Sequence, residues 1–317
     1  MIQTRLATAI TIAMASLAFA SVALACNIPV FRYALERWKS DAYEIVVMHG
    51  GDLTAEQLAY VDSLDKASAA SSGAANITIS HERGAEATTP QIAVRMSMTS
   101  GRMVNHWQGT FEEAKSASLL QSPARMELVK RLLAGDSVVW LLLRSNDETK
   151  SNAAKQLLVD SFKTLKAKVS LPDGIGLPGS ELHSEVPLFV KFSLIEIDAD
   201  DASEEFLLSS LGGFQADAIR AGEPLLVPVF GRGRALEVIP ATIINPSLIE
   251  DLTRFLSGAC SCQVKEQNPG FDLLLSVNWD TELYGVDGLR PPPAKSVGEG
   301  DRAPRTIAIP PGKRKEK

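Results

Sequence analysis

Hydrophobic and polar positions follow one another along the chain in two similar series. The first series reads as a strand, a helix, a strand, a hairpin and a closing helix, and these segments are residues 43–49, 54–67, 76–82, 91–111 and 122–135. Thr54 is placed to cap the first helix, and Ser122, followed by a proline, is placed to cap the closing one. The pattern therefore predicts a small α/β unit.

The second series repeats this order with stronger signals. It predicts a buried strand, a long amphipathic helix, a strand, a short helix, a hairpin and a closing helix at residues 138–145, 149–168, 189–198, 203–214, 223–240 and 245–258. The two closing segments, SPARMELVKRLLAG and NPSLIEDLTRFLSG, align without a gap and place apolar residues at matching positions. We therefore expect an α/β protein made of two tandem units.

The order of elements resembles the thioredoxin fold, in which a proline that is usually cis starts the third strand beside the active site. Pro224 in EPLLVPVF resembles that proline closely, and Pro90 in TPQIAVRM resembles it less closely. The resemblance implies two thioredoxin-like domains, residues 26–136 and 137–258. The first is degenerate, because it lacks the helix before its proline.

The family's C-x-x-C redox centre opens the helix after the first strand, where the helix dipole lowers the thiol pKa. The corresponding segments are HGGDLTAEQ (49–57) and SNDETKSNA (145–153), and neither contains cysteine. We therefore expect a non-catalytic binding or assembly module. The alternative is a thiol-based redox or soft-metal-handling protein that uses the three cysteines found elsewhere.

Those cysteines are Cys26, which follows the apolar leader, and the pair Cys260 and Cys262 in a predicted appendage at 259–288. Three interpretations stay open. Cys26 pairs with Cys260 or Cys262 as a structural disulfide, with Cα atoms within about 7 Å. The three thiolates bind a soft ion, Cu(I) or Zn(II). Cys26 carries a lipid, which leaves the C-x-C alone. No other cofactor is predicted.

Two weaker candidate sites lie where the resemblance places the active-site pole of each unit. His49 and His81 are expected at the carboxyl ends of neighbouring parallel strands near Pro90, so two imidazoles there could bind a metal or transfer a proton. At the second pole, near Pro224, acidic residues gather, which indicates either a cation site or a solvated rim. These are Asp147, Glu148, Asp198, Asp200, Asp201 and Glu223.

The ends of the chain indicate export. Residues 1–25 read as a cleavable signal peptide, with one base before an apolar run and an A-x-A exit, so we expect an extracytoplasmic protein of the periplasm or cell envelope. The chain has 32 basic and 38 acidic residues, which argues against nucleic-acid binding. Residues 289–317 form a predicted disordered, Pro-rich basic tail that could contact a membrane surface. The expected partner is another protein of the cell envelope.

Overall fold

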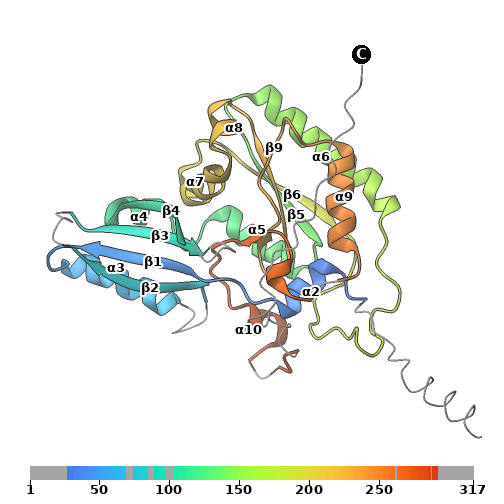
Figure 1. Ribbon diagram of the computed structural model, residues 1–317, viewed down its shortest axis with the longest axis horizontal. Helices are drawn as coiled ribbons and strands as arrows, with labels where there is room; N and C mark the ends of the chain where they lie inside the picture. Colours follow the sequence, from blue (N-terminus) through green and yellow to red (C-terminus); the bar gives the residue numbers. More distant parts are fainter. Residues whose placement is uncertain are drawn as a thin grey trace, which may run out of the picture.

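The computed structural model describes residues 27–68, 74–84, 89–97, 103–260, 263–286 and 288–291, which form a mixed α/β protein with two β-sheets (Figure 1). The expected α/β class is confirmed. In chain order the elements are α2 (Val30–Arg37), β1 (Tyr43–His49), α3 (Ala55–Ala67), β2 (Ile77–Arg83), β3 (Gln91–Ser97), β4 (Met103–Thr110), α4 (Phe111–Ser116), α5 (Pro123–Leu133), β5 (Val138–Leu143), α6 (Glu148–Lys168), β6 (Phe192–Ile197), α7 (Glu205–Gly212), α8 (Ala216–Arg220), β7 (Leu225–Phe230), β8 (Arg234–Ala235), β9 (Ile239–Pro240), α9 (Pro246–Ser257), β10 (Phe271–Asp272) and α10 (Trp279–Tyr284). Residues 1–25 and 292–317 lie outside the described residues.

The first sheet has the strand order β2-β1-β3-β4 and forms the lobe at the left of Figure 1. β1 is parallel to β2 and antiparallel to β3, which is antiparallel to β4. Because side chains alternate along a strand, Tyr43, Ile45 and Val47 all reach the same face. There they join Leu64 of α3 and Phe111 of α4 in one buried cluster. Helices α3 and α4 therefore cover this face.

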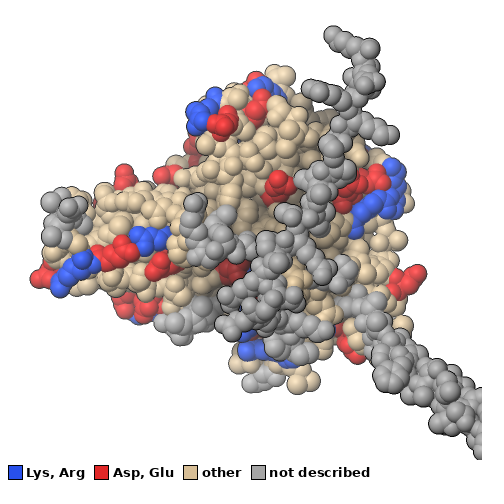
Figure 2. Space-filling view, viewed as in Figure 1, with Lys and Arg blue, Asp and Glu red and all other residues tan. Residues whose placement is uncertain are grey.

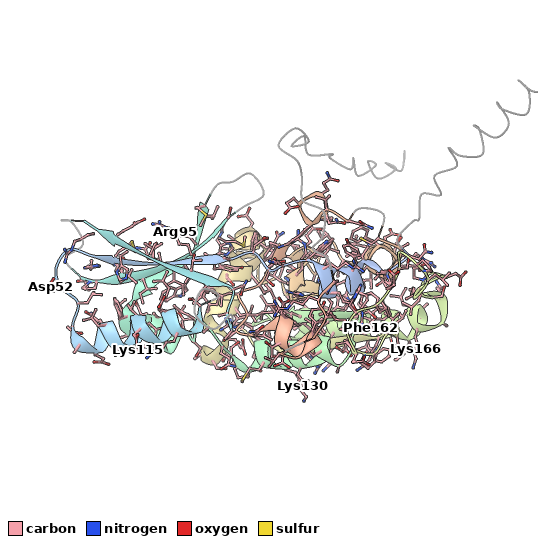
Figure 3. All side chains as sticks on the ribbon, turned by 90° about the horizontal axis from the view of Figure 1, so that it is seen from below. Asp52, Arg95, Lys115, Lys130, Phe162 and Lys166 are labelled. Carbon is pink, nitrogen blue, oxygen red and sulfur yellow. The ribbon has the colours of Figure 1, made fainter. Side chains whose placement is uncertain are left out.

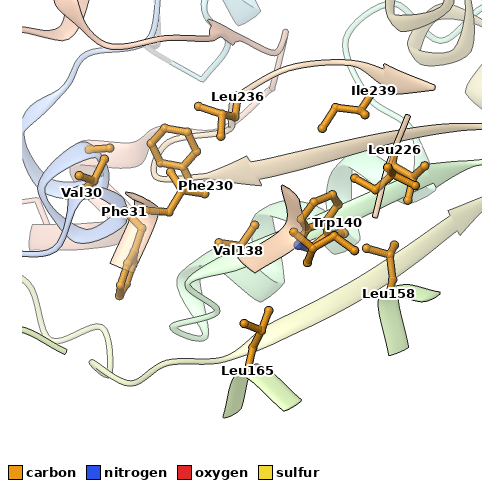
Figure 4. Packing of buried hydrophobic residues seen from close by; sticks show 14 of the residues in the cluster. Val30, Phe31, Val138, Trp140, Leu158, Leu165, Leu226, Phe230, Leu236 and Ile239 are labelled. Atoms are coloured by element: carbon orange, nitrogen blue, oxygen red, sulfur yellow. The ribbon is translucent and has the colours of Figure 1, made fainter. Parts of the chain in front are cut away.

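The second sheet repeats the order as β6-β5-β7-β8, with β10 added beyond β8 and β9 beside β7. β5 is parallel to β6 and antiparallel to β7. All residues of β5 and β7 are buried, as expected for strands with both faces covered. One face of the second sheet carries a buried cluster that contains Trp140 of β5, Leu158 of α6 and Phe31 of α2 (Figure 4). Val139 and Leu141 pack against α5 and α7 on the other.

Helix α5 packs on the second sheet, although its alignment with α9 suggested that it would close the first unit. Leu128 and Leu132 lie one turn apart on α5 and are almost fully buried in the cluster that contains Val139 and Leu141 of β5. α5 also contacts β6. Helix α5 therefore covers the second sheet and not the second face of the first sheet.

The N-terminal caps of the helices agree with the sequence in one case and differ in another. Thr54 caps α3 as expected, since its hydroxyl accepts a hydrogen bond from the amide of Gln57. Ser122 does not cap α5 through its side chain. Glu204 accepts hydrogen bonds from the Ala124 amide and from the Ser122 hydroxyl, both at 2.6 Å. A carboxylate from a distant segment therefore caps α5 and holds it on the second unit.

A buried charged cluster joins the two units. The Asp272 carboxylate on β10 accepts hydrogen bonds from the Arg234 guanidinium (3.1 Å), the Lys265 ammonium (2.5 Å) and the backbone amide of Asp41 (2.6 Å). The Tyr43 hydroxyl, at the start of β1, donates to the Asp272 carbonyl oxygen at 2.8 Å. Burial raises the pKa of Tyr43 above its usual range, so this hydroxyl stays a donor. The cluster therefore connects β1 of the first sheet to β8 and β10 of the second.

Helix α2 belongs to the second unit in space, although it precedes the first in sequence. It contacts α9 and β7. Its Arg32 and Glu36 form a buried ion pair at 2.9 Å. Glu36 also accepts hydrogen bonds from the amides of His183 and Ser184, and these bonds satisfy the remaining lone pairs of the carboxylate. Within the described residues, no helix has the length and apolar character needed to cross a membrane.

Candidate functional site

The two prolines of the predicted poles occupy equivalent positions. Pro90 directly precedes β3 and Pro224 directly precedes β7, as expected. The register pairs Met48 with Gln91 in the first sheet and Leu143 with Leu225 in the second, so each proline comes directly beyond the last pair. No cis peptide bond occurs among the described residues, so the bonds before both prolines are trans, unlike the usual bond in the family that the sequence resembles.

The first pole brings His49 and His81 together, as the sequence predicted. His49 ends β1, and His81 lies in the parallel neighbour β2, where it pairs with Val47. The two ring centroids are 5.8 Å apart and the planes are nearly perpendicular, at 87°. His49 is buried, whereas His81 is exposed. The Nδ1 atom of His49 lies 2.7 Å from the carbonyl oxygen of Gly51.

The second pole contains the predicted acidic residues, but basic side chains neutralise several of them. Arg144 forms ion pairs with Glu148 (2.5 Å), Glu196 (2.7 Å) and Asp198 (3.5 Å). Burial raises the pKa of Glu196, but hydrogen bonds from Lys155 and Arg144 outweigh it and hold this pKa below its ordinary value. The pole is therefore a network of ion pairs, not a set of carboxylates open to a cation.

Three further acidic residues of that pole also have partners. Glu223 pairs with Lys150 at 2.6 Å. Asp147 accepts a hydrogen bond from the Lys150 amide and caps α6, and Asp201 accepts one from the Ser203 amide. Within the described residues, no group of three or more His, Cys, Asp or Glu side chains is placed to hold a metal ion.

The cysteines are described in part. Cys260 is 2% exposed and belongs to the core cluster that contains Ile28. Its backbone amide donates a hydrogen bond to the Ile28 carbonyl oxygen at 2.9 Å, next to an antiparallel bridge between Pro29 and Ala259. Cys26 and Cys262 lie outside the described residues. The start of the described chain thus runs beside the segment that precedes the C-x-C.

Sequence reasoning missed a third feature, the face of the first sheet opposite α3 and α4. We call it the Arg95 face. Figure 3 shows Arg95 on one side of the sheet and Lys115 with α3 on the other. The polar side chains of the Arg95 face are joined by hydrogen bonds and are all exposed or half-buried: Glu44, Ser80, Glu82, Gln91, Arg95, Asn105 and Gln108.

Arg95 is at the centre of this network. Its guanidinium donates to both carboxylate oxygens of Glu82, at 2.6 and 3.1 Å, and to the amide oxygen of Asn105 at 3.1 Å. The hydrogen bond from Arg95 holds the pKa of Glu82 below its ordinary value. Gln108 donates to Gln91 at 2.7 Å. Acidic and basic side chains alternate across this lobe (Figure 2). The face therefore presents donors and acceptors without a strong net charge.

The sequence contained a signal for this face. Polar residues occupy alternate positions of strands whose other positions are apolar, as in Glu44, Ser80 and Arg95. That alternation is typical of an antiparallel or mixed sheet with one face in water.

We find no match for the chain among protein-family models, curated proteins or solved structures.

Proposed function

We propose that the protein is an exported, non-catalytic binding or assembly module with two thioredoxin-like units. The shared strand order, the equivalent positions of Pro90 and Pro224, and the absence of cysteine from residues 49–57 and 145–153 support this proposal. In it, the second unit is the scaffold and the Arg95 face of the first unit is the binding surface. The single observation that carries it is that, among the described residues, helices lie on both faces of the second sheet but on one face of the first, whose other face carries the polar network around Arg95.

The partner that fits the Arg95 face is another protein of the cell envelope with a polar, hydrated contact surface. Protein interfaces make about one hydrogen bond per 100–200 Å² and need both donors and acceptors. Arg95 and the amides of Gln91 and Gln108 supply donors, and Glu44 and Glu82 supply acceptors. Two acids and one base give no excess of positive charge, so a nucleic-acid backbone is a poor match.

Site-specific photo-crosslinking tests this function. A benzophenone amino acid replaces Gln108 on the Arg95 face or, as the control, exposed Lys163 on α6. We expect one crosslinked partner from position 108 and none from position 163, and we expect Arg95→Glu to abolish the crosslink. Equal crosslinking at the two positions, or a crosslink that survives Arg95→Glu, contradicts the assignment of this face.

The rival redox or metal-handling function would use the thiols, whereas a structural disulfide would occupy two of them, and one observation favours the disulfide. The amide of Cys260 donates to Ile28, only two residues after Cys26. We propose that Cys26 forms a structural disulfide with Cys260 or Cys262. Closure of so long a loop would stabilise the fold by about 5 kcal/mol in the chain-entropy model.

Intact mass, thiol counting and elemental analysis of the exported protein separate the alternatives. A disulfide lowers the mass by two hydrogen atoms and leaves one thiol, a lipid on Cys26 raises the mass, and a three-thiolate site retains metal. The non-catalytic function also predicts that the protein does not accelerate the reduction of insulin by dithiothreitol. Acceleration that disappears in Cys260→Ser would establish the rival function.

A further inference from the structure

The two histidines of the first pole have the arrangement of a pair of metal ligands. They come from neighbouring parallel strands, and their rings lie 5.8 Å apart between centroids. Histidine is the commonest protein ligand for transition metals, and it binds through a neutral ring nitrogen. The pair is independent of the Arg95 face, because alternation along β1 and β2 places both histidines on the side of the sheet that α3 covers.

His49 already has the proton distribution that a metal ligand needs. Its Nδ1 atom lies 2.7 Å from the Gly51 carbonyl oxygen, and a carbonyl oxygen only accepts hydrogen bonds. Nδ1 therefore carries the proton, and in the neutral ring Nε2 keeps its lone pair. Metal-bound histidines in proteins generally donate their other ring N–H to a carbonyl or carboxylate in this way, which fixes the orientation of the ring.

The separation of the rings fits coordination of a single ion. Two imidazole nitrogens about 2.0–2.1 Å from one metal place their ring centroids about 5 Å apart at a tetrahedral angle and about 4.5 Å apart at the right angle that Cu(II) prefers. The observed separation of 5.8 Å is within about 1.5 Å of both values, so binding needs only a modest approach of the two rings. His81 is exposed and forms no side-chain hydrogen bond or ion pair with the described residues, so its ring can turn toward an ion bound to His49 without breaking a contact of that kind.

We propose that His49 and His81 form a two-imidazole site for a divalent late transition-metal ion, with Cu(II) bound most tightly. Imidazole suits copper, nickel and zinc, and Cu(II) has the highest affinity in the order of the divalent ions. Arg83, opposite His49 in the strand register, pairs with Asp52 at 3.2 Å, which offsets its positive charge. The described residues supply no third ligand, so the other positions are open to water or to a donor from a partner.

Titration of the untagged full chain with aqueous Cu(II), followed by electron paramagnetic resonance, tests the site. The wild type should bind one equivalent with hyperfine coupling to two nitrogens. His81→Asn should weaken binding at least tenfold and leave coupling to a single nitrogen. His81 is exposed, so this variant keeps the packed core, which circular dichroism verifies.

His183→Asn is the matched control, because the contact of His183 with Glu36 is made by its backbone amide, and it should bind Cu(II) as the wild type does. Unchanged binding in His81→Asn overturns the proposal. Bound copper without nitrogen coupling, as thiolate ligation would give, overturns it as well.

Discussion

In the part of the chain that the structure describes, helices cover both faces of the second sheet but only one face of the first. Both have the same strand order, so the difference arises from the connections. Between its second and third strands the second unit carries α7 and α8, but the first unit has only the short segment from Gly84 to Pro90. The second helix after the first sheet, α5, packs on the second sheet. The second sheet therefore has helix α5 in its core, and the first sheet does not.

The largest effect is expected at the junction between the two sheets. Asp272→Ala leaves the buried Arg234 guanidinium without its carboxylate partner and leaves Lys265 paired with Asp41 alone. Loss of one member of a buried ion pair costs about 3–5 kcal/mol. We expect this loss in the free energy of unfolding measured with urea. Asp217→Ala, which removes an exposed ion pair with Arg220, is the control and should change stability by less than about 0.5 kcal/mol. Equal effects would show that the junction does not hold the units together.

Helix α5 gives a test of which sheet it stabilises. Leu128→Ala removes a fully buried side chain from the core of the second unit and should cost about 2–5 kcal/mol. Hydrogen exchange should accelerate more in β5 than in β3. Met126, on the same helix, is 49% exposed, so Met126→Ala should have little effect. Greater acceleration in β3 would assign α5 to the first unit after all.

We expect the stability of the fold to depend on pH through His106 of β4. This residue lies where the first sheet meets the segment after α7. The centroid of its ring lies 6.0 Å from that of Tyr43 and 5.3 Å from that of Phe214, and burial lowers its pKa below the ordinary value. The unfolded chain therefore binds a proton more readily than the folded one. Stability is fully present above the unfolded pKa of about 6.5 and falls as the pH decreases below it.

Urea unfolding at about pH 7.5 and about pH 5.5 measures this dependence. His106→Gln should lose less stability between the two pH values than the wild type does. The exposed His81→Asn variant, in the presence of a chelator, should behave as the wild type. If His106→Gln shows the full wild-type loss, another group is responsible.

The smallest effect is expected on the Arg95 face. Arg95→Ala removes hydrogen bonds to Glu82 and Asn105, but exposed ion pairs contribute about 0–1 kcal/mol. The melting temperature should therefore change little. A loss comparable with that of Leu128→Ala would mean that this face is part of the core and not a surface kept for binding.

The sequence predicted the order of the elements better than their partners. Strands whose apolar residues alternate, and helices started by Thr54 or Pro246, were recognisable from local patterns. The apolar stripe of α5 requires a buried neighbour but does not say which sheet supplies it. The cap of α5 was missed because Glu204 is distant in sequence, and the Ser122 hydroxyl bonds to it.

The candidate sites show the same limit. The approach of His49 and His81 followed from the rule that parallel strands end at one edge of a sheet. The acidic pole looked open because its acids were considered without Arg144 and Lys155. The Arg144/Glu148 pair, four residues apart, was the available signal. The sequence showed that the first unit lacks the helix before its proline. It was not inferred from this that the strands of the Arg95 face would be left exposed.

Carboxylate footprinting tests most directly whether the Arg95 face is a binding surface. Glu82 on that face and Asp160 on α6 have similar side-chain exposure, 52% and 56%, and each pairs with a basic residue. Labelling with a water-soluble carbodiimide should modify the two equally in the purified protein. In the cells that produce the protein, the account predicts that Glu82 is protected and that Asp160 is not. Equal modification of both carboxylates in cells would contradict it.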